Sequence, residues 1–150
     1  MGGPDGFHQR LHHVRPGNLD PETAQTSGMH RLAAISGSTV GSSAIWMGQT
    51  HVAAATRSGD HHHGESETAI YIVSGQPVFV FHSDGSDGQP AGEVRIETHP
   101  GDYIFVPPYL PHREENPDPD HEAVVVIARS TQEAIVVNVP NLAARPDQPD

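Results

Sequence analysis

The chain has 150 residues, 35% of them hydrophobic, and this length and composition suffice for one domain with a core but not for two. Its formal net charge is −11. All 8 basic residues are arginines. This acidic balance argues against nucleic acid and anionic membranes as partners, because binding to either requires clusters of Lys and Arg. The absence of cysteine excludes disulfides, thiolate metal ligands and thiol nucleophiles.

The two ends of the chain differ in amino-acid composition from its middle. Residues 1–30 are polar and interrupted by proline and glycine, and we expect an arm that packs on the domain or on a partner subunit. The start lacks the apolar stretch of a secretory signal, and no window approaches the ~20 apolar residues of a membrane span. We therefore expect a soluble, cytoplasmic protein. Residues 141–150 carry prolines and aspartates and are expected to be a flexible tail.

Residues 31–140 form the single expected domain. Short runs rich in β-branched and aromatic residues alternate there with Gly, Pro and Asp, which predicts an all-β sandwich or barrel. The expected strands are residues 43–55, 68–74, 77–82, 93–98, 103–106, 123–128 and 134–139. The segment DGSDG at 84–88 is typical of a hairpin loop. The only helix-compatible stretch, residues 21–34, has a weak pattern.

Histidines mark the most informative part of the chain. On a strand, residues i and i+2 share a face, so His61 and His63 can point the same way while His62 points away. His112 follows a strand and a proline-rich turn that restricts the backbone. Such imidazoles, with a carboxylate close by, suit a divalent metal. Composition and spacing alone leave open whether the histidines form this site or a solvated turn.

Two stretches resemble the paired motifs of the cupin superfamily. In the first, the pair His61 and His63 is followed by a closing glycine, Gly75. The second motif matches at the family's spacing, with its residues at Gly101, Pro107, His112 and Asn116. About 25 residues separate the two motifs, which suits the family's intervening hairpin. The resemblance spans roughly residues 40–130 and implies a jelly-roll β-barrel, commonly dimeric, that holds a metal ion through His61, His63 and His112.

The chain departs from the family pattern in two ways. Ala55 and Tyr109 stand where the motifs have glycine. Glu67 follows His63 as the family's glutamate ligand does, but seven rather than six residues separate it from Gly75. One extra residue on a strand turns a side chain to the opposite face unless a bulge absorbs it. The fourth ligand is therefore either Glu67 or His51, a histidine on the preceding strand.

A resemblance that extends beyond the two motifs indicates a more specific function. The sequence is similar to small bacterial single-domain cupins that include aromatic polyketide cyclases of the tetracenomycin and resistomycin type. That resemblance implies a lyase of antibiotic biosynthesis, which closes a poly-β-keto chain by an aldol-type reaction and removes water to form an aromatic ring. It further implies one divalent metal per subunit, with zinc favoured over iron, nickel or manganese. The polyketide would arrive free or on an acyl carrier protein, and the enzyme would be a homodimer.

Further residues receive roles from the same resemblance. Glu67 and His51 are the candidate catalytic bases. An apolar cavity is expected to fold the substrate, with walls formed by Trp46, Tyr71, Phe79, Phe81, Tyr103 and Phe105. Two alternatives stay open: a metal-dependent dioxygenase or isomerase that acts on a small diketone, flavonoid or sugar-like substrate, and a non-catalytic cupin that binds a small ligand. Zinc without oxygen uptake favours cyclisation, whereas iron with oxygen uptake favours a dioxygenase.

Overall fold

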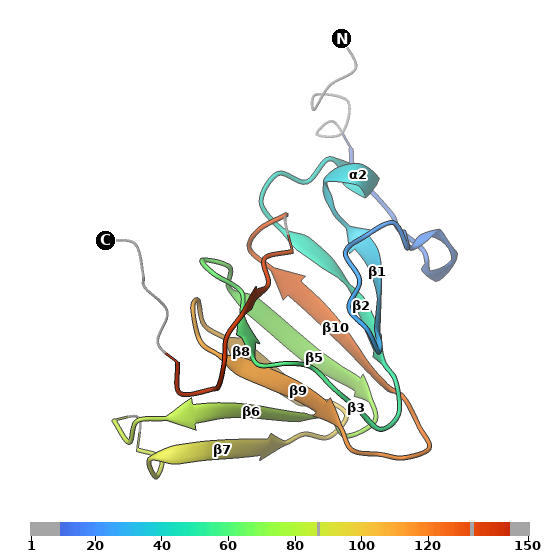
Figure 1. The fold of residues 1–150 in the computed structure, drawn as a ribbon. Helices are drawn as coiled ribbons and strands as arrows, with labels where there is room; N and C mark the ends of the chain where they lie inside the picture. Colours follow the sequence, from blue (N-terminus) through green and yellow to red (C-terminus); the bar gives the residue numbers. More distant parts are fainter. Residues whose placement is uncertain (1–9, 87, 133, 145–150) are drawn as a thin grey trace.

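The computed structural model describes residues 10–86, 88–132 and 134–144 as a jelly-roll sandwich of two antiparallel sheets (Figure 1). The first sheet has the strand order β1 (Met29–Ile35), β2 (Trp46–Val52), β10 (Ala123–Arg129), β5 (Thr68–Ser74) and β8 (Tyr103–Val106). The second has the order β11 (Val137–Asn138), β4 (His61–His62), β9 (His112–Asn116), β6 (Val78–Ser83) and β7 (Gly92–Glu97), and β3 (Thr56–Arg57) pairs with β9. The described helices are the short 3₁₀ helix η1 (Pro16–Asn18) and α2 (Gly37–Val40). The predicted all-β jelly-roll fold is confirmed.

The core lies between the two sheets. Its largest cluster combines both layers and consists of Ile70, Ile72, Phe79, Val106 and Val125. Strand β5 shows the alternation most clearly, because Thr68, Ile70 and Ile72 are buried while the residues between them are exposed. Burial on alternating positions is what fixes the register of a strand with one face on the core.

The outer face of the first sheet is apolar near its β8 edge. Tyr71 and Val73 on β5 and Tyr103 and Phe105 on β8 are exposed there. The rings of Tyr71 and Tyr103 lie 4.8 Å apart. The sequence predicts that the second apolar face of such strands meets a cavity or another subunit. This outer face is the candidate surface for a homodimer, and the homodimer stays a prediction.

The strands follow the predicted runs, with four additions. Strands β5 and β8 begin and end where the sequence predicts. Strand β1 overlaps residues 21–34, where the sequence pattern weakly favours a helix. The segment is a strand because Met29–Ile35 pairs with β2. The short strands β3 and β4, and β9, lie outside the predicted runs. No helix in the described part of the chain is long and apolar enough to cross a membrane.

Both ends of the domain extend beyond the expected limits. Asp20, in the expected arm, forms a bridge with Ala33 of β1, so part of the arm is joined to the sheet. Leu142 is 5% exposed and packs with Val78 and Val80 in a second core cluster. The expectation of a flexible tail is therefore wrong for its beginning, since burial of a leucine anchors it. Residues 145–150 lie outside the described residues.

The two positions where the motifs lack glycine share an unusual backbone. Ala55 has φ 51° and Tyr109 has φ 62°, and among the described residues no other non-glycine has a positive φ. A side chain in this left-handed region is strained by about 1–2 kcal/mol. The family's glycines are thus explained by the backbone conformation, which this chain keeps without them.

The strain at Ala55 gives a stability prediction. Ala55→Gly should raise the free energy of unfolding by about 0.5–1 kcal/mol, since relief of the left-handed strain outweighs the entropy that glycine adds to the unfolded chain. Urea unfolding followed by fluorescence measures it. Ala53→Gly, two residues earlier and without a positive φ, should destabilise by a similar amount. Equal shifts of the two variants in one direction would contradict the assignment of strain.

Candidate metal centre

Three histidines converge at one end of the space between the sheets. One ring nitrogen from each of His61, His63 and His112 lies within 4.8 Å of the others. Backbone register explains this, because β4 pairs with β9 so that His61 is opposite His112. His63 lies two residues after His61, and its ring centroid is 4.9 Å from that of His61 and 5.0 Å from that of His112. The structure thus brings together the three residues that the sequence pattern assigns to the metal.

Hydrogen bonds fix the tautomer of all three imidazoles. Each Nδ1 lies next to a backbone carbonyl oxygen, at Gly59 (2.8 Å), Ile135 (2.8 Å) and Leu110 (3.0 Å) respectively. A carbonyl oxygen only accepts, so each Nδ1 carries the proton and each Nε2 keeps its lone pair. Backbone carbonyls commonly orient metal-binding histidines in this way.

The charge state of the histidines also suits a cation. Burial, together with the neighbouring imidazoles, lowers the pKa of His112 to about 3. Burial likewise lowers the pKa of His63 to about 4 and lowers that of His61. The three rings are therefore neutral at physiological pH, and their lone pairs are available. Such a donor set fits a divalent transition metal.

His62 separates from its neighbours as strand alternation predicts. Its ring faces the opposite side of β4, where it packs 5.8 Å from the ring of Tyr109. Its Nδ1 accepts a hydrogen bond from the Gly64 amide at 2.9 Å. His62 is 4% exposed, so it is a buried residue that holds the turn after β4.

Arg113 ties the strands of the centre together on the outer side of β9. Its guanidinium donates to Glu115 at 2.7 Å, to Glu93 at 2.9 Å and to Asp60 at 3.3 Å. These hydrogen bonds raise the pKa of Arg113 above its ordinary value. Asp60 directly precedes His61, so the network couples the start of β4 to the strand that carries His112.

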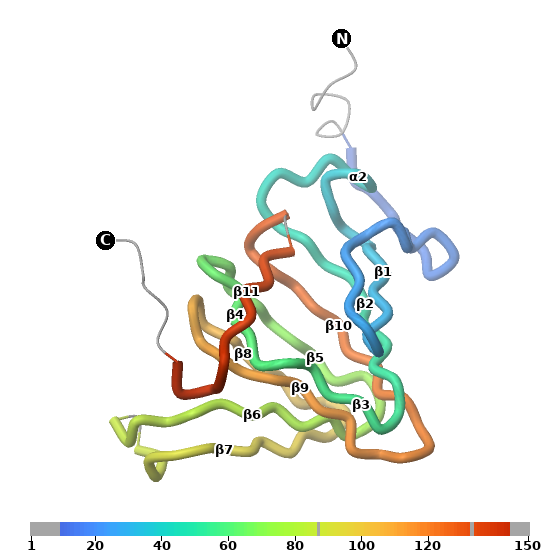
Figure 2. The backbone as a smooth tube through the Cα atoms, viewed as in Figure 1, coloured from blue at the N-terminus to red at the C-terminus, as the bar shows by residue number. Residues whose placement is uncertain are grey.

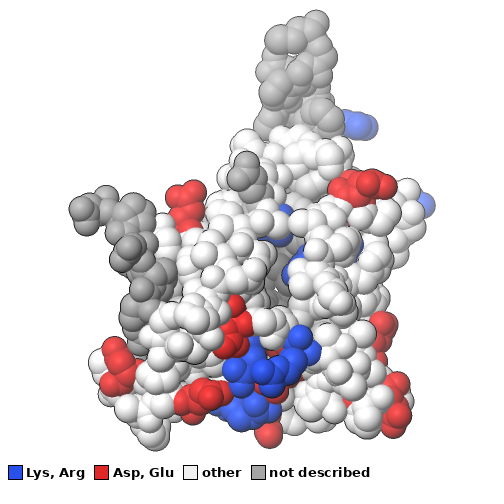
Figure 3. Space-filling view, in the orientation of Figure 1, with Lys and Arg blue, Asp and Glu red and all other residues white. Residues whose placement is uncertain are grey.

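The histidines open into a cavity of about 120 Å³. Figure 3 shows a hollow on the viewed face into which basic side chains reach. The segment that carries β11, which Figure 2 shows beside β4, contributes Ala134, Ile135 and Val136 to its wall. Polar and charged side chains provide much of the remainder, namely Arg31, Thr50, Ser66, Thr68, Glu114 and Arg129.

Glu114 brings a carboxyl group into this cavity. Strand β9 buries His112, Glu114 and Asn116 in alternation, so the glutamate shares a face with the metal-binding candidate. Its amide donates to Ser58 Oγ at 3.0 Å, and its carbonyl accepts from the Ser58 amide at 2.9 Å. Burial raises its pKa to about 7, against the opposing effect of Arg31. The sequence analysis missed Glu114, although the same alternation that selects His112 points to it.

Two arginines reach the cavity from the first sheet. Arg31 on β1 donates through Nη1 to Thr26 Oγ1 at 2.8 Å. Arg129 at the end of β10 lies 4.1 Å above the ring of Trp46 and donates to the carbonyl oxygens of Thr131 and Gln132. Burial lowers the pKa of Arg31, and it lowers that of Arg129 to about 10. The sequence analysis did not select either arginine.

The structure does not bring Glu67 or His51 to the three histidines. Glu67 is exposed, and its neighbour Thr68 lines the cavity instead, which is the effect of the one-residue excess before Gly75. His51 lies on the outer face of β2 with its Nδ1 3.1 Å from Glu122, while Thr50 faces the cavity. The predictions of a fourth ligand and a catalytic base at these residues are therefore wrong in their geometry.

The expected aromatic residues do not gather around one cavity. None of the six lines the cavity that all three histidines share. Trp46 lies under Arg129, and Tyr71 and Tyr103 lie on the outer face of the first sheet. The three phenylalanines, Phe79, Phe81 and Phe105, line a second, more apolar hollow, which His112 also borders. Alternation alone could not say which face of each strand meets the cavity.

Comparison with known proteins agrees with this geometry. Residues 48–128 match the family model described as "Cupin domain". The polyketide cyclase RemF from Streptomyces resistomycificus has a similar structure, with a TM-score of 0.61 and 20% identity over 87% of this chain and 84% of that one. Oxalate decarboxylase from Lactobacillus farciminis, in a formate complex, is similar with a TM-score of 0.63 and 13% sequence identity over 80% of this chain. An S161A mutant of the Bacillus subtilis oxalate decarboxylase is similar with a TM-score of 0.62 and 21% sequence identity over 79% of this chain.

The compared chains differ in extent. This chain spans 34% of the Lactobacillus farciminis enzyme and 30% of the Bacillus subtilis one, about a third of each. No curated protein sequence matches it. At these identities the likeness to solved structures establishes a shared fold.

Proposed function

The chain belongs to the cupin family, and from this premise we propose that it is a metal-dependent polyketide cyclase, which closes a ring in a poly-β-keto substrate by an aldol-type reaction. The observation that carries the proposal is that three Nε2 lone pairs and the buried carboxyl group of Glu114 face one cavity. The extent of the structural match with RemF also supports the proposal, because the match covers 84% of that protein's length.

The chemistry divides between the metal and the chain. A divalent cation held by His61, His63 and His112, with zinc favoured, supplies Lewis acidity toward a ketone oxygen. The carboxylate of Glu114 takes a proton from a methylene group between two ketones, and the resulting enolate carbon forms a bond to a ketone carbon further along the substrate. The new alkoxide takes this proton back from Glu114, and loss of water with enolisation of the ring ketones then gives the aromatic ring. General base catalysis of this kind contributes about 10²–10⁴-fold to the rate.

The small cavity supports a second candidate. Its volume of about 120 Å³ lies below the ~300 Å³ at which sites for drug-sized ligands begin. A poly-β-keto chain would place only its reacting segment inside and extend the remainder through the mouth. A small diketone or dicarboxylic acid would fit whole, which favours an oxygen-dependent or decarboxylating cupin enzyme.

Product analysis tests the proposal against this alternative. Untagged, zinc-loaded protein is incubated with a linear poly-β-keto chain made in situ by a minimal polyketide synthase, and the products are resolved by mass spectrometry. We expect one aromatic product, lighter than the linear chain by water, without oxygen consumption and lost after chelation. An unchanged product mixture contradicts the cyclase. Oxygen uptake by iron-loaded protein with a small diketone would support the alternative.

A further inference from the structure

We propose that Arg31 and Arg129 form an anion subsite that takes a carboxylate of the substrate beside the three histidines. The inference rests on the proposed enzymatic use of this cavity and adds a property of the substrate. The ligand would be a keto acid rather than a neutral ketone or ester.

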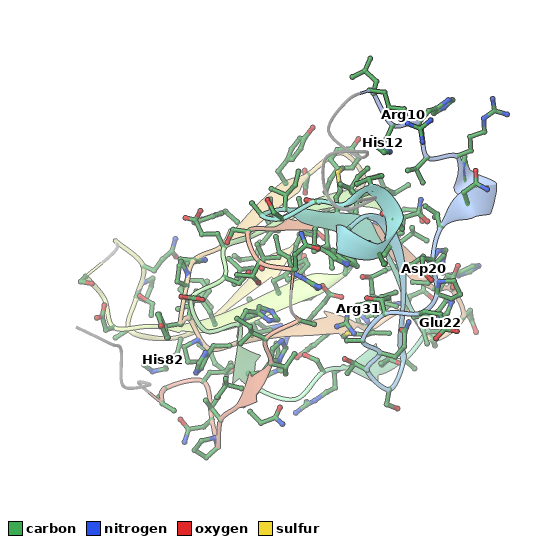
Figure 4. All side chains as sticks on the ribbon, turned by 90° about the horizontal axis from the view of Figure 1, so that it is seen from above. Arg10, His12, Asp20, Glu22, Arg31 and His82 are labelled. Atoms are coloured by element: carbon green, nitrogen blue, oxygen red, sulfur yellow. The ribbon has the colours of Figure 1, made fainter. Side chains whose placement is uncertain are left out.

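The first support is that neither guanidinium group forms a salt bridge with a described residue, although the carboxyl group of Glu114 shares their cavity. Both line the cavity, and within the described ranges neither lies within salt-bridge distance of a carboxylate. Figure 4 shows Arg31 further toward the middle of the molecule than Asp20 and Glu22. Among the described residues, two partly buried arginines without a salt bridge share this cavity with a single carboxyl group, that of Glu114, so a ligand that offsets their desolvation would have to carry negative charge.

The second support is a set of hydrogen-bond donors that the protein leaves unused. Arg31 donates through Nη1 alone, and Arg129 through Nε and Nη2. Among the described residues, Arg31 Nε, Arg31 Nη2 and Arg129 Nη1 therefore have no acceptor. Nε and Nη2 of one arginine form the planar fork that binds both oxygens of a carboxylate.

Thr50 supplies an independent third observation. Its side chain lines the same cavity, is 1% exposed, and has no hydrogen-bond partner for Oγ1 in the part of the chain that the structure describes. A buried hydroxyl without a partner costs free energy. A carboxylate oxygen in the cavity would accept its hydrogen bond.

The electrostatic balance of the cavity favours an anion even when Glu114 is ionised. Glu114 is the only carboxylate among the described residues that line the cavity, and it faces two guanidinium groups. A bound carboxylate would balance the charges of Arg31, Arg129 and an ionised Glu114.

Calorimetry with a matched pair of probes tests the subsite. The probes are 4,6-dioxoheptanoate, a stable β-diketone with a terminal carboxylate, and its methyl ester. Both are titrated into the zinc-loaded full chain and into the metal-free chain. The acid should bind about 10- to 100-fold more tightly than the ester in each form, since a charge-assisted hydrogen bond contributes that much.

Variants assign the preference to the arginines. Arg31→Gln and Arg129→Gln should each lower the preference for the acid by about tenfold or more and leave ester binding within about threefold. Arg31→Lys keeps a cation and serves if the glutamine variant unfolds; it should lose part of the preference because lysine lacks the fork that Nε and Nη2 of Arg31 form. Arg57→Gln is the matched control, because Arg57 is exposed on β3 and does not line the cavity.

The outcomes separate this inference from the proposed function. Equal binding of acid and ester, or a preference that survives in both arginine variants, would overturn the subsite. A preference that disappears on removal of zinc would place the carboxylate on the metal and overturn it as well. A preference that depends on the arginines in both forms supports the subsite even if no cyclisation is detected.

Discussion

Replacing His112 with alanine should lower the affinity for zinc by more than about 100-fold and abolish turnover. Residues that only orient a ligand already contribute 10–100-fold to metal affinity, and loss of one of three imidazole donors should exceed that. His112 is the most buried of the three histidines and lies within 5.0 Å of both partner rings, so no other described side chain replaces its Nε2. Elemental analysis of untagged protein after dialysis, with a chromophoric chelator as competitor, measures the affinity.

His62→Ala provides the matched control for this loss. His62 is buried beside two of the ligands but faces the other side of β4. Its replacement should reduce stability while the protein keeps about one zinc per chain. Glu67→Ala and His51→Ala should also keep the metal, because neither side chain reaches the centre. Full metal retention in both His61→Ala and His112→Ala would show that the metal binds elsewhere.

Strand alternation and motif spacing correctly predicted that the three candidate metal ligands are neighbours. His61 and His63 share a face because they are two residues apart, and the second motif supplied His112 from a distant part of the chain. The same rule identified the difficulty with Glu67, whose place before Gly75 is occupied by Thr68. These predictions succeeded because they depend on local geometry, which each strand carries in its own sequence.

The walls of the cavity could not be predicted in the same way. Alternation divides a strand into two faces but does not say which of them is turned to the partner sheet. Phe105 and Tyr71 are apolar enough for a core, yet they lie on the outer face. Arg31 and Arg129 reach the interior from β1 and β10, which are joined only through β2. Such charged residues become recognisable once the pairing of distant strands is known.

Glu114→Gln should lower kcat by about 10²–10⁴-fold and leave the fold, the metal content and substrate affinity nearly unchanged. Glutamine keeps the shape of the side chain but cannot accept a proton from the substrate carbon. The backbone hydrogen bonds of residue 114 with Ser58 do not involve the side chain and persist in the variant. Steady-state kinetics of product formation on zinc-loaded protein separates kcat from KM.

Glu115→Gln is the control that isolates the role of the cavity. Glu115 is the next residue on β9, faces the opposite side and accepts hydrogen bonds from Arg95 and Arg113. Its replacement weakens an outer ion-pair network and should reduce stability without a matching loss of kcat. If Glu114→Gln turns over like the wild type, the proton goes to another group and the role assigned to Glu114 is wrong. If both variants lose kcat equally, the effect comes from β9 as a strand, because only Glu114 faces the histidines.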